Sequence, residues 1–140
     1  MTRDEITALF ARRESDFEEM DAAALAADYA DDAVIESPMT GVHRGPAAAE
    51  HAFAAVFTAF ADMTRHTESL LIDGNYVAEV VTVEGANIGG MMGLPPSGKS
   101  FRVPAVFLYE LRGNKIARER RIMDFTGLLV QIGVLKAKPA

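Results

Sequence analysis

Residues 113–133 of the chain read Gly-Asn-Lys-Ile-Ala-Arg-Glu-Arg-Arg-Ile-Met-Asp-Phe-Thr-Gly-Leu-Leu-Val-Gln-Ile-Gly, and the fold can be worked out from this stretch. Gly113 and Asn114 both tolerate a positive φ, so together they predict a tight turn between two strands. The strand that follows ends at a single carboxylate, Asp124. Four apolar residues come next and are expected to cover the end of this strand: Leu128, Leu129, Ile132 and Val134.

This apolar cover makes Asp124 a candidate for acid/base chemistry. A carboxyl group beside a dry cavity is costly to ionise, so its pKa rises toward the range in which it gives and takes protons. The alternative interpretation is that Asp124 forms a turn or is a solvated charge at a strand end. The spacing by itself leaves both interpretations open.

The composition predicts one domain over residues 1–140 and excludes several function classes. The 14 basic and 20 acidic residues give a net charge of -6, which does not suit a nucleic-acid backbone or an anionic membrane surface. Without cysteine there is no disulfide framework and no thiolate metal site. We therefore expect a cytoplasmic protein with no metal site, no nucleic-acid partner and no membrane partner.

The first half of the chain has helical signals. Thr2 and Glu5 form a capping box that predicts a helix start, and Asp21 predicts a second helix over residues 22–29. A short strand is expected over residues 33–37, and Gly45-Pro46 begins a further amphipathic helix. Four large apolar residues form the core-facing stripe of that helix: Phe53, Val56, Phe57 and Phe60.

The second half of the chain changes to the period of strands. Four strands are predicted over residues 66–73, 76–88, 101–112 and 115–125, joined mostly by tight turns into an antiparallel meander. Five alternate residues of the third strand are expected to face the core: Val103, Ala105, Phe107, Tyr109 and Leu111. The loop over residues 89–99 is rich in Gly, Met and Pro, and it is either the lip of a pocket or a long hairpin connection.

This order of elements predicts an α+β fold in which N-terminal helices pack in a curved antiparallel sheet, a cone-shaped α+β barrel. The interior of such a cone is a natural place for a small hydrophobic molecule.

The chain also resembles the SnoaL-like polyketide cyclase family of the nuclear transport factor 2-like superfamily over nearly its whole length. The resemblance rests on Asp31-Asp32-Ala33-Val34 leading to Pro38, Gly45-Pro46-Ala47-Ala48 before Phe53, and Phe60-Ala61-Asp62. It continues with the loop from Gly89 through Met92-Gly93 to Pro95-Pro96-Ser97-Gly98-Lys99, then Gly113-Asn114-Lys115-Ile116, Asp124 and Gln131-Ile132-Gly133.

The resemblance implies a cone-shaped fold, a homodimer formed through the outer face of the sheet, and Asp124 as general acid/base in a cofactor-free aldol condensation. This chain departs from the family pattern at Asn87, where members often carry His, and at Arg120, where a large group such as Trp is common. Strict alternation puts Arg120, Ile122 and Asp124 on one face of the strand. Arg120 is expected either to point into the pocket or to turn to solvent, where it could pair with Glu110.

The predicted catalytic residue is therefore Asp124. The predicted substrate-binding residues are Asn87, Arg120, Tyr109, Met92, Phe107, Ile122 and Phe57. The predicted reaction is an aldol cyclisation, an isomerisation or a hydrolysis of a hydrophobic, carbonyl-bearing molecule. The alternatives are a non-catalytic ligand-binding or dimerising domain and, third, a protein–protein module.

Overall fold

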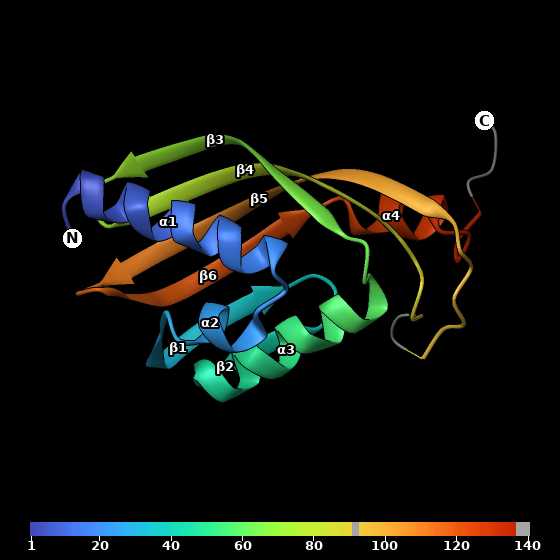
Figure 1. Cartoon of the computed structure of the whole chain (residues 1–140), viewed down its shortest axis with the longest axis horizontal. Helices are drawn as coiled ribbons and strands as arrows, with labels where there is room; N and C mark the ends of the chain where they lie inside the picture. The colour runs from blue at the N-terminus through green and yellow to red at the C-terminus, as the bar shows by residue number, and fades with distance from the viewer. Residues whose placement is uncertain (91–92, 137–140) are drawn as a thin grey trace.

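The computed structural model describes residues 1–90 and 93–136 (Figure 1). Its elements, in chain order, are α1 (Arg3–Glu18), α2 (Ala22–Ala26), β1 (Tyr29–Ser37), β2 (Gly41–Arg44), α3 (Gly45–Ala59), β3 (Thr64–Asp73), β4 (Tyr76–Ala86), β5 (Ser100–Arg112), β6 (Lys115–Met123) and α4 (Phe125–Gln131).

The six strands form one curved sheet in the order β2-β1-β6-β5-β4-β3. Strands β3 to β6 form the predicted antiparallel meander. The sheet is not wholly antiparallel as predicted, because β1 pairs with β6 in parallel. Strand β2, which pairs with β1, was not predicted, since it has only four residues between a turn and a helix. Figure 1 shows α1, α2 and α3 on one face of an unclosed sheet, which confirms the cone-shaped α+β fold class.

The helices begin where the sequence signals lie. The Thr2–Glu5 capping box is present, with the Glu5 N–H donating to Thr2 Oγ1 at 3.1 Å and the Thr2 N–H donating to Glu5 Oε2 at 2.7 Å. Helix α3 begins at Gly45, whose φ of 80° suits glycine, and Pro46 follows in its first turn. Helix α2 is shorter than predicted, because Tyr29 already belongs to β1.

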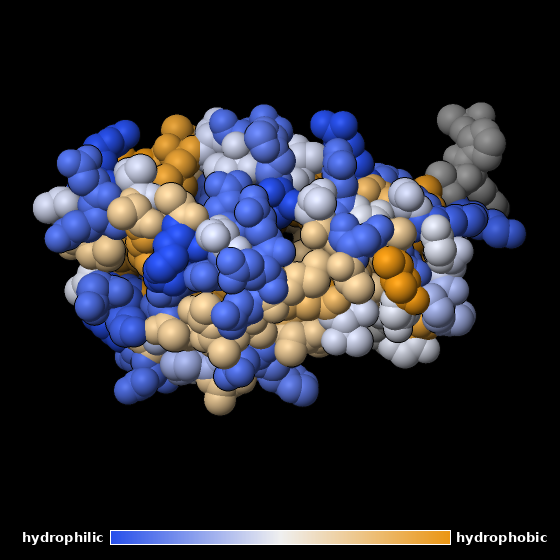
Figure 2. Space-filling view, viewed as in Figure 1, coloured by the Kyte–Doolittle hydropathy of each residue, from blue (hydrophilic) through white to orange (hydrophobic). Residues whose placement is uncertain are grey.

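The core lies between the helices and the inner face of the sheet. Helix α1 contributes Ile6 and Phe10, and α3 contributes Phe53 and Phe57. The predicted inner face of β5 is confirmed, with Val103, Ala105, Tyr109 and Leu111 buried and Phe107 partly buried. In Figure 2 the tan, moderately apolar surface gathers over α2 and α3, which are rich in alanine.

The end of the sheet beside α4 is closed by the apolar segment that the sequence predicted as a cover. Leu128 and Ile132 are almost completely buried there, against Val103 and Ala105 of β5. In residues 1–90 and 93–136, no helix has the length and the apolar character needed to cross a membrane.

Candidate functional site

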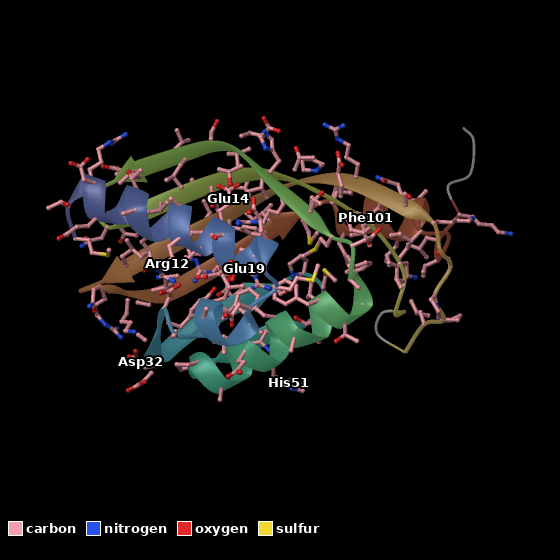
Figure 3. All side chains as sticks on the ribbon, in the orientation of Figure 1. Arg12, Glu14, Glu19, Asp32, His51 and Phe101 are labelled. Carbon is pink, nitrogen blue, oxygen red and sulfur yellow. The ribbon has the colours of Figure 1, made fainter. Side chains whose placement is uncertain are left out.

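An apolar cavity opens between the inner face of the sheet and helices α1 and α3. Its walls include five phenyl rings: Phe17, Phe53, Phe60, Phe101 and Phe107. Three charged side chains also line it, Arg65 from β3 and both Glu119 and Arg121 from β6. Phe101 is labelled in Figure 3, on β5 and toward the α4 end of the sheet. The cavity is thus a mainly apolar space with a few charged groups on its walls.

Glu119 and Arg121 form a buried ion pair on the cavity wall. Arg121 Nε donates to Glu119 Oε2 at 2.6 Å, and the Tyr29 hydroxyl donates to Glu119 Oε1 at 2.9 Å. Burial would raise the pKa of Glu119, but the charges of Arg121 and Arg13 outweigh it and hold that pKa below its ordinary value. Burial would lower the pKa of Arg121, but Glu119 and Tyr29 raise it instead. Both groups of the pair therefore stay charged at neutral pH.

Arg65 on β3 and Glu79 on β4 form a second buried ion pair, separated from β6 by strand β5. The Arg65 guanidinium bonds directly to the Glu79 carboxylate, and both side chains are almost completely buried. The Tyr109 hydroxyl lies 3.4 Å from Glu79 Oε1, and burial raises the pKa of Tyr109 well above its ordinary value. The Arg65 guanidinium also lies over the rings of Phe17 and Phe107, 4.4 and 4.7 Å from their centroids.

Arg13, on helix α1, lies between the two ion pairs and links them. It donates to the Tyr29 hydroxyl at 3.2 Å, to the Leu25 carbonyl at 3.0 Å and to the Asp28 carboxylate at 2.8 Å. Its guanidinium lies 5.3 Å from the ring centroid of Tyr29 and 5.9 Å from that of Tyr109. This hydrogen-bond network fixes the side chains that it joins, so Glu119 and Arg121 are held in place before any ligand arrives.

Two N–H groups on the cavity arginines are buried without a hydrogen-bond partner among the described residues: Arg65 Nε and Arg121 Nη2. A buried donor left unpaired costs about 1–3 kcal/mol, so these groups favour a ligand that brings oxygen acceptors. Among residues 1–90 and 93–136, no three His, Asp or Glu side chains come together in the way that a metal site needs.

The cavity adjoins a wider groove on the surface. Four residues line both spaces, and we call this boundary the neck: Met39, Thr40, Val56 and Phe60. The cavity has a volume of about 80 Å³ and the groove about 570 Å³. The cavity alone is smaller than the few hundred Å³ typical of ligand sites, so a multi-ring ligand would have to extend through the neck into the groove.

Asp124, the predicted catalytic residue, is exposed and is not among the residues that line the cavity. Its carboxylate accepts the Gly127 N–H at 2.9 Å and so caps the first turn of α4. Its neighbour Met123 and Leu128 do line the cavity. Asp124 is therefore next in sequence to a residue of the cavity wall, but its carboxylate points to solvent.

The prediction for β6 gave the correct alternation but assigned the wrong face to the interior. Arg120 is exposed, with its Nε 3.6 Å from Glu36 rather than near Glu110, and Ile122 is exposed beside it on the outer face. The inner face carries Glu119 and Arg121 instead. The physical reason is that residues 118–121 are all charged, so hydrophobicity does not mark which face of the strand is buried.

The other predicted binding residues are divided between the cavity wall and the surrounding core. Phe107 lines the cavity, whereas Phe57 and Tyr109 are buried behind it in the core. Asn87 is completely buried, and no described residue bonds to either atom of its side-chain amide. Met92 lies outside the described residues.

Sequence reasoning missed the charged residues of the cavity wall, Arg65, Glu119 and Arg121. It also missed the buried residues that bond to them or support them, Arg13, Tyr29 and Glu79. One available signal was Glu79, a carboxylate on the apolar face of β4 between Val77 and Val81. A charged residue in a buried position needs a partner, so Glu79 predicts a buried cation nearby.

The fold defines an α+β domain of the nuclear transport factor 2-like type, with an apolar cavity inside the cone. The model of the SnoaL-like polyketide cyclase family matches residues 8–132, so the chain belongs to that family.

Individual relatives agree with this assignment. Nogalonic acid methyl ester cyclase of Streptomyces nogalater is 30% identical over 107 residues, which cover 76% of this chain and 78% of that protein. The structure of TsrD from Streptomyces laurentii is similar with a TM-score of 0.85 at 22% identity, over 96% of this chain and 99% of TsrD. Wild-type IdmH from Streptomyces antibioticus has a TM-score of 0.74 at 27% identity, over 94% of this chain and 97% of IdmH.

Proposed function

We propose that this protein is a cofactor-independent enzyme that closes a ring in a hydrophobic, carbonyl-bearing molecule by intramolecular aldol condensation. The observation that carries the proposal is the pair of buried, unpartnered N–H groups of Arg65 and Arg121 among the described residues of the apolar cavity. The phenyl rings suit a planar apolar ligand, and the two guanidinium groups suit its carbonyl oxygens.

The reaction uses groups of the kind found here. An acidic proton is lost from the carbon next to one carbonyl, and the resulting enolate carbon forms a C–C bond with a second carbonyl carbon. The oxygen of that second carbonyl becomes an alkoxide and takes up a proton. No electrons leave or enter the substrate, so the step needs no redox cofactor. Guanidinium N–H groups in a dry cavity stabilise the enolate and the alkoxide as their charge develops.

The acid/base role of Asp124 belongs to this proposal as its finer part. For that role the carboxylate would have to leave the Gly127 N–H and turn inward beside Met123. Asp124→Asn tests it cleanly, because Asn caps a helix about as well as Asp but cannot transfer protons. A loss of turnover of about 10²-fold or more with an unchanged melting temperature would support the role. Unchanged turnover would remove Asp124 from the mechanism.

The proposed reaction can be tested with nogalonic acid methyl ester, the compound that names the Streptomyces nogalater relative. Conversion is followed by chromatography and mass spectrometry for wild type, Arg121→Lys and a matched surface variant, Arg102→Lys. Arg121→Lys keeps the charge beside Glu119 but loses the planar, forked donor. We expect it to lower kcat by about 10²-fold, a typical cost of losing one oxyanion donor, while Arg102→Lys has no effect. An unchanged kcat in Arg121→Lys would refute the assigned role.

The second candidate function is binding of a small ligand without catalysis. The exposed position of Asp124 favours it, since the one carboxylate among the described residues that line the cavity, Glu119, is engaged by Arg121. Calorimetry that detects tight binding of the ester, combined with no conversion over a long incubation, would decide for this function.

We also propose a homodimer through the outer face of the sheet. Two adjacent cross-strand rows there are apolar over three strands each, one with Leu71, Ala78 and Leu108 and the other with Val80, Val106 and Ile122. The first row continues to Arg120 on β6 and the second to Ser69 on β3. Leu71 and Ile122, at opposite edges of this apolar area, are 61% and 48% exposed. Sedimentation should give a dimer for wild type and a monomer for Leu108→Glu with Ile122→Glu, and a monomeric wild type would refute the proposal.

The cytoplasmic location stays a prediction that cell fractionation would test.

A further inference from the structure

Thr40 and His43 lie together at the neck of the cavity. Thr40 lines both the cavity and the groove, so it borders the path along which a ligand would enter. Thr40 Oγ1 and His43 Nε2 are 2.6 Å apart, which is a short hydrogen bond. Sequence analysis did not single out either residue, and neither has a role in the proposal above.

The local fold explains why this histidine reaches the neck. Thr40 lies in the turn between β1 and the edge strand β2, and His43 lies on β2, three residues later in the chain. His43 pairs with Ile35 of β1, a completely buried residue, so both side chains lie on the inner face of the sheet. His43 is half-buried there, and α3 packs over the same face. The imidazole is thus held in place but remains within reach of water.

The charged surroundings of His43 keep its imidazole neutral. Burial lowers the pKa of His43, and the positive charges of Arg121 on β6 and His51 on α3 lower it further. In Figure 3 His51 points away from the sheet on the outer side of α3. The carboxylate of the neighbouring strand β1, Glu36, is engaged by Arg118 and Arg120 on the outer face. A neutral imidazole has one nitrogen lone pair that can accept a proton, and here the Thr40 hydroxyl is placed to donate to it.

We propose that Thr40 and His43 form a proton-transfer pair for a ligand hydroxyl at the neck of the cavity. This inference rests on the proposed ring closure, and it assigns the acid/base step to this pair in place of Asp124, whose carboxylate caps α4. In the enol tautomer of the ligand the acidic proton has already moved from the carbon to the carbonyl oxygen. This enolic O–H gives its proton to Thr40 Oγ1, while the Thr40 proton moves to His43 Nε2. The enolate carbon then forms the C–C bond, and the imidazolium returns its proton through Thr40 to the new alkoxide. One proton leaves and one returns, so the pair ends the cycle unchanged.

The surroundings of the other candidate bases support His43 as the proton acceptor. Glu119 and Glu79 are each bonded to an arginine, and an ionised carboxylate with a lowered pKa is a weak base. The imidazole is bonded to no carboxylate among the described residues, and its pKa lies below the ordinary histidine value because of burial, so it is neutral at pH 7 and free to accept a proton. Arg121 lies close enough to act on the charge of His43, so the donor for the oxyanion and the proton acceptor serve one end of the cavity.

The experiment compares the pH dependence of kcat/KM for wild type, His43→Gln, Thr40→Val and Thr40→Ser with nogalonic acid methyl ester. His66→Gln is the matched control, because His66 is exposed on β3 and far along the sheet from β2. We expect wild type to lose activity as the pH falls through the pKa of His43. His43→Gln and Thr40→Val should each lose about 10²-fold or more, while Thr40→Ser keeps most of the activity because it keeps the hydroxyl.

A second readout does not depend on turnover. Nitrogen-15 NMR of the histidine rings should show His43 titrating below the ordinary histidine pKa, with its proton on Nδ1 when neutral and its Nε2 accepting from Thr40. The Thr40→Val variant should lose that tautomer preference. If His43 only supported the structure, the pKa at which kcat/KM falls on the acid side would not match the pKa that NMR assigns to His43.

The outcomes separate the two proposals. If wild type converts the ester and His43→Gln converts it equally well, the proton-transfer pair is refuted and the ring closure stands. If NMR finds the neutral proton of His43 on Nε2, or an ordinary pKa, the pair is refuted as well. If wild type does not convert the ester at all, the proposed ring closure fails and the pair fails with it.

Discussion

Removing the negative charge of Glu119 should be among the most destabilising single changes in this protein. The Glu119 side chain is only 2% exposed, and it accepts hydrogen bonds from Arg121 and Tyr29 at 2.6 and 2.9 Å. Glu119→Gln keeps the shape and an acceptor for Tyr29, but it leaves the Arg121 guanidinium buried without a counter-charge. Breaking a buried ion pair in this way costs about 3–5 kcal/mol. That is a large part of the roughly 5–15 kcal/mol by which a domain is stable.

The assay is urea denaturation at pH 7, followed by circular dichroism, with melting curves as a second measure. A loss of about 4 kcal/mol should lower the melting temperature of a domain of this size by roughly 10–15 °C. The matched control is Glu84→Gln, which breaks the exposed pair between Glu84 and Arg102, 3.3 Å apart. Solvent screens that pair, so the control should lose no more than about 1 kcal/mol.

A rescue variant shows whether the stranded charge is the cause. Glu119→Gln combined with Arg121→Met removes both charges, keeps the acceptor for Tyr29 and replaces a long side chain by an apolar one of similar length. Replacing a whole buried ion pair is often close to neutral, so the double variant should recover most of the lost stability. If the double variant is as unstable as Glu119→Gln, or if Glu119→Gln costs no more than the exposed control, the reasoning about this ion pair is wrong.

Three further predictions concern the cap, the loop and the pH dependence. Asp124→Ala should lower stability by about 1 kcal/mol in urea denaturation through loss of the α4 cap, while Asp124→Asn should not, and equal losses would contradict the capping role. Gly89→Ala should lower the melting temperature, because a Cβ there would collide with the backbone carbonyl of Thr58, and an unchanged value would contradict this contact. The pKa of Glu119 is lower in the folded state than in the unfolded chain, so its contribution is complete above about pH 4.3. It is lost as the pH falls through the folded value, and acid titration should show a shallower loss of stability in Glu119→Gln than in wild type.

The sequence predicted the architecture because its signals are local and repeated. The capping box at Thr2, the Gly45-Pro46 helix start and the turn at Gly113-Asn114 each fix one element boundary by backbone chemistry. The alternation in β5 then fixed which face of the sheet is the inner one. Strand β2 and the parallel pairing of β1 with β6 were not predicted, because they depend on strand pairing that a local sequence pattern does not contain.

The site was harder to predict, because its charged residues come from several elements that only the fold brings together. Arg13 and Asp28 lie near the N-terminus, Arg65 and Glu79 come from the middle, and Glu119 and Arg121 come from β6. In sequence each is one charge among many. Asp124 attracted attention because it is isolated between apolar residues, yet such isolation is equally typical of a helix cap, which is the role that its hydrogen bond shows.

The pairing of these buried charges bears on the chemistry of the cavity. Arg13, Arg65 and Arg121 are matched by Asp28, Glu79 and Glu119, so the three pairs together carry no net charge. The cavity therefore offers N–H donors without an excess of positive charge, and this favours a neutral carbonyl oxygen over a ligand carboxylate. The N–H donors stabilise an oxyanion formed there, and a positive charge that appeared nearby at the same moment would stabilise it further. Protonation of His43, at the neck and close to Arg121, would supply that charge and remove it again when the proton returns.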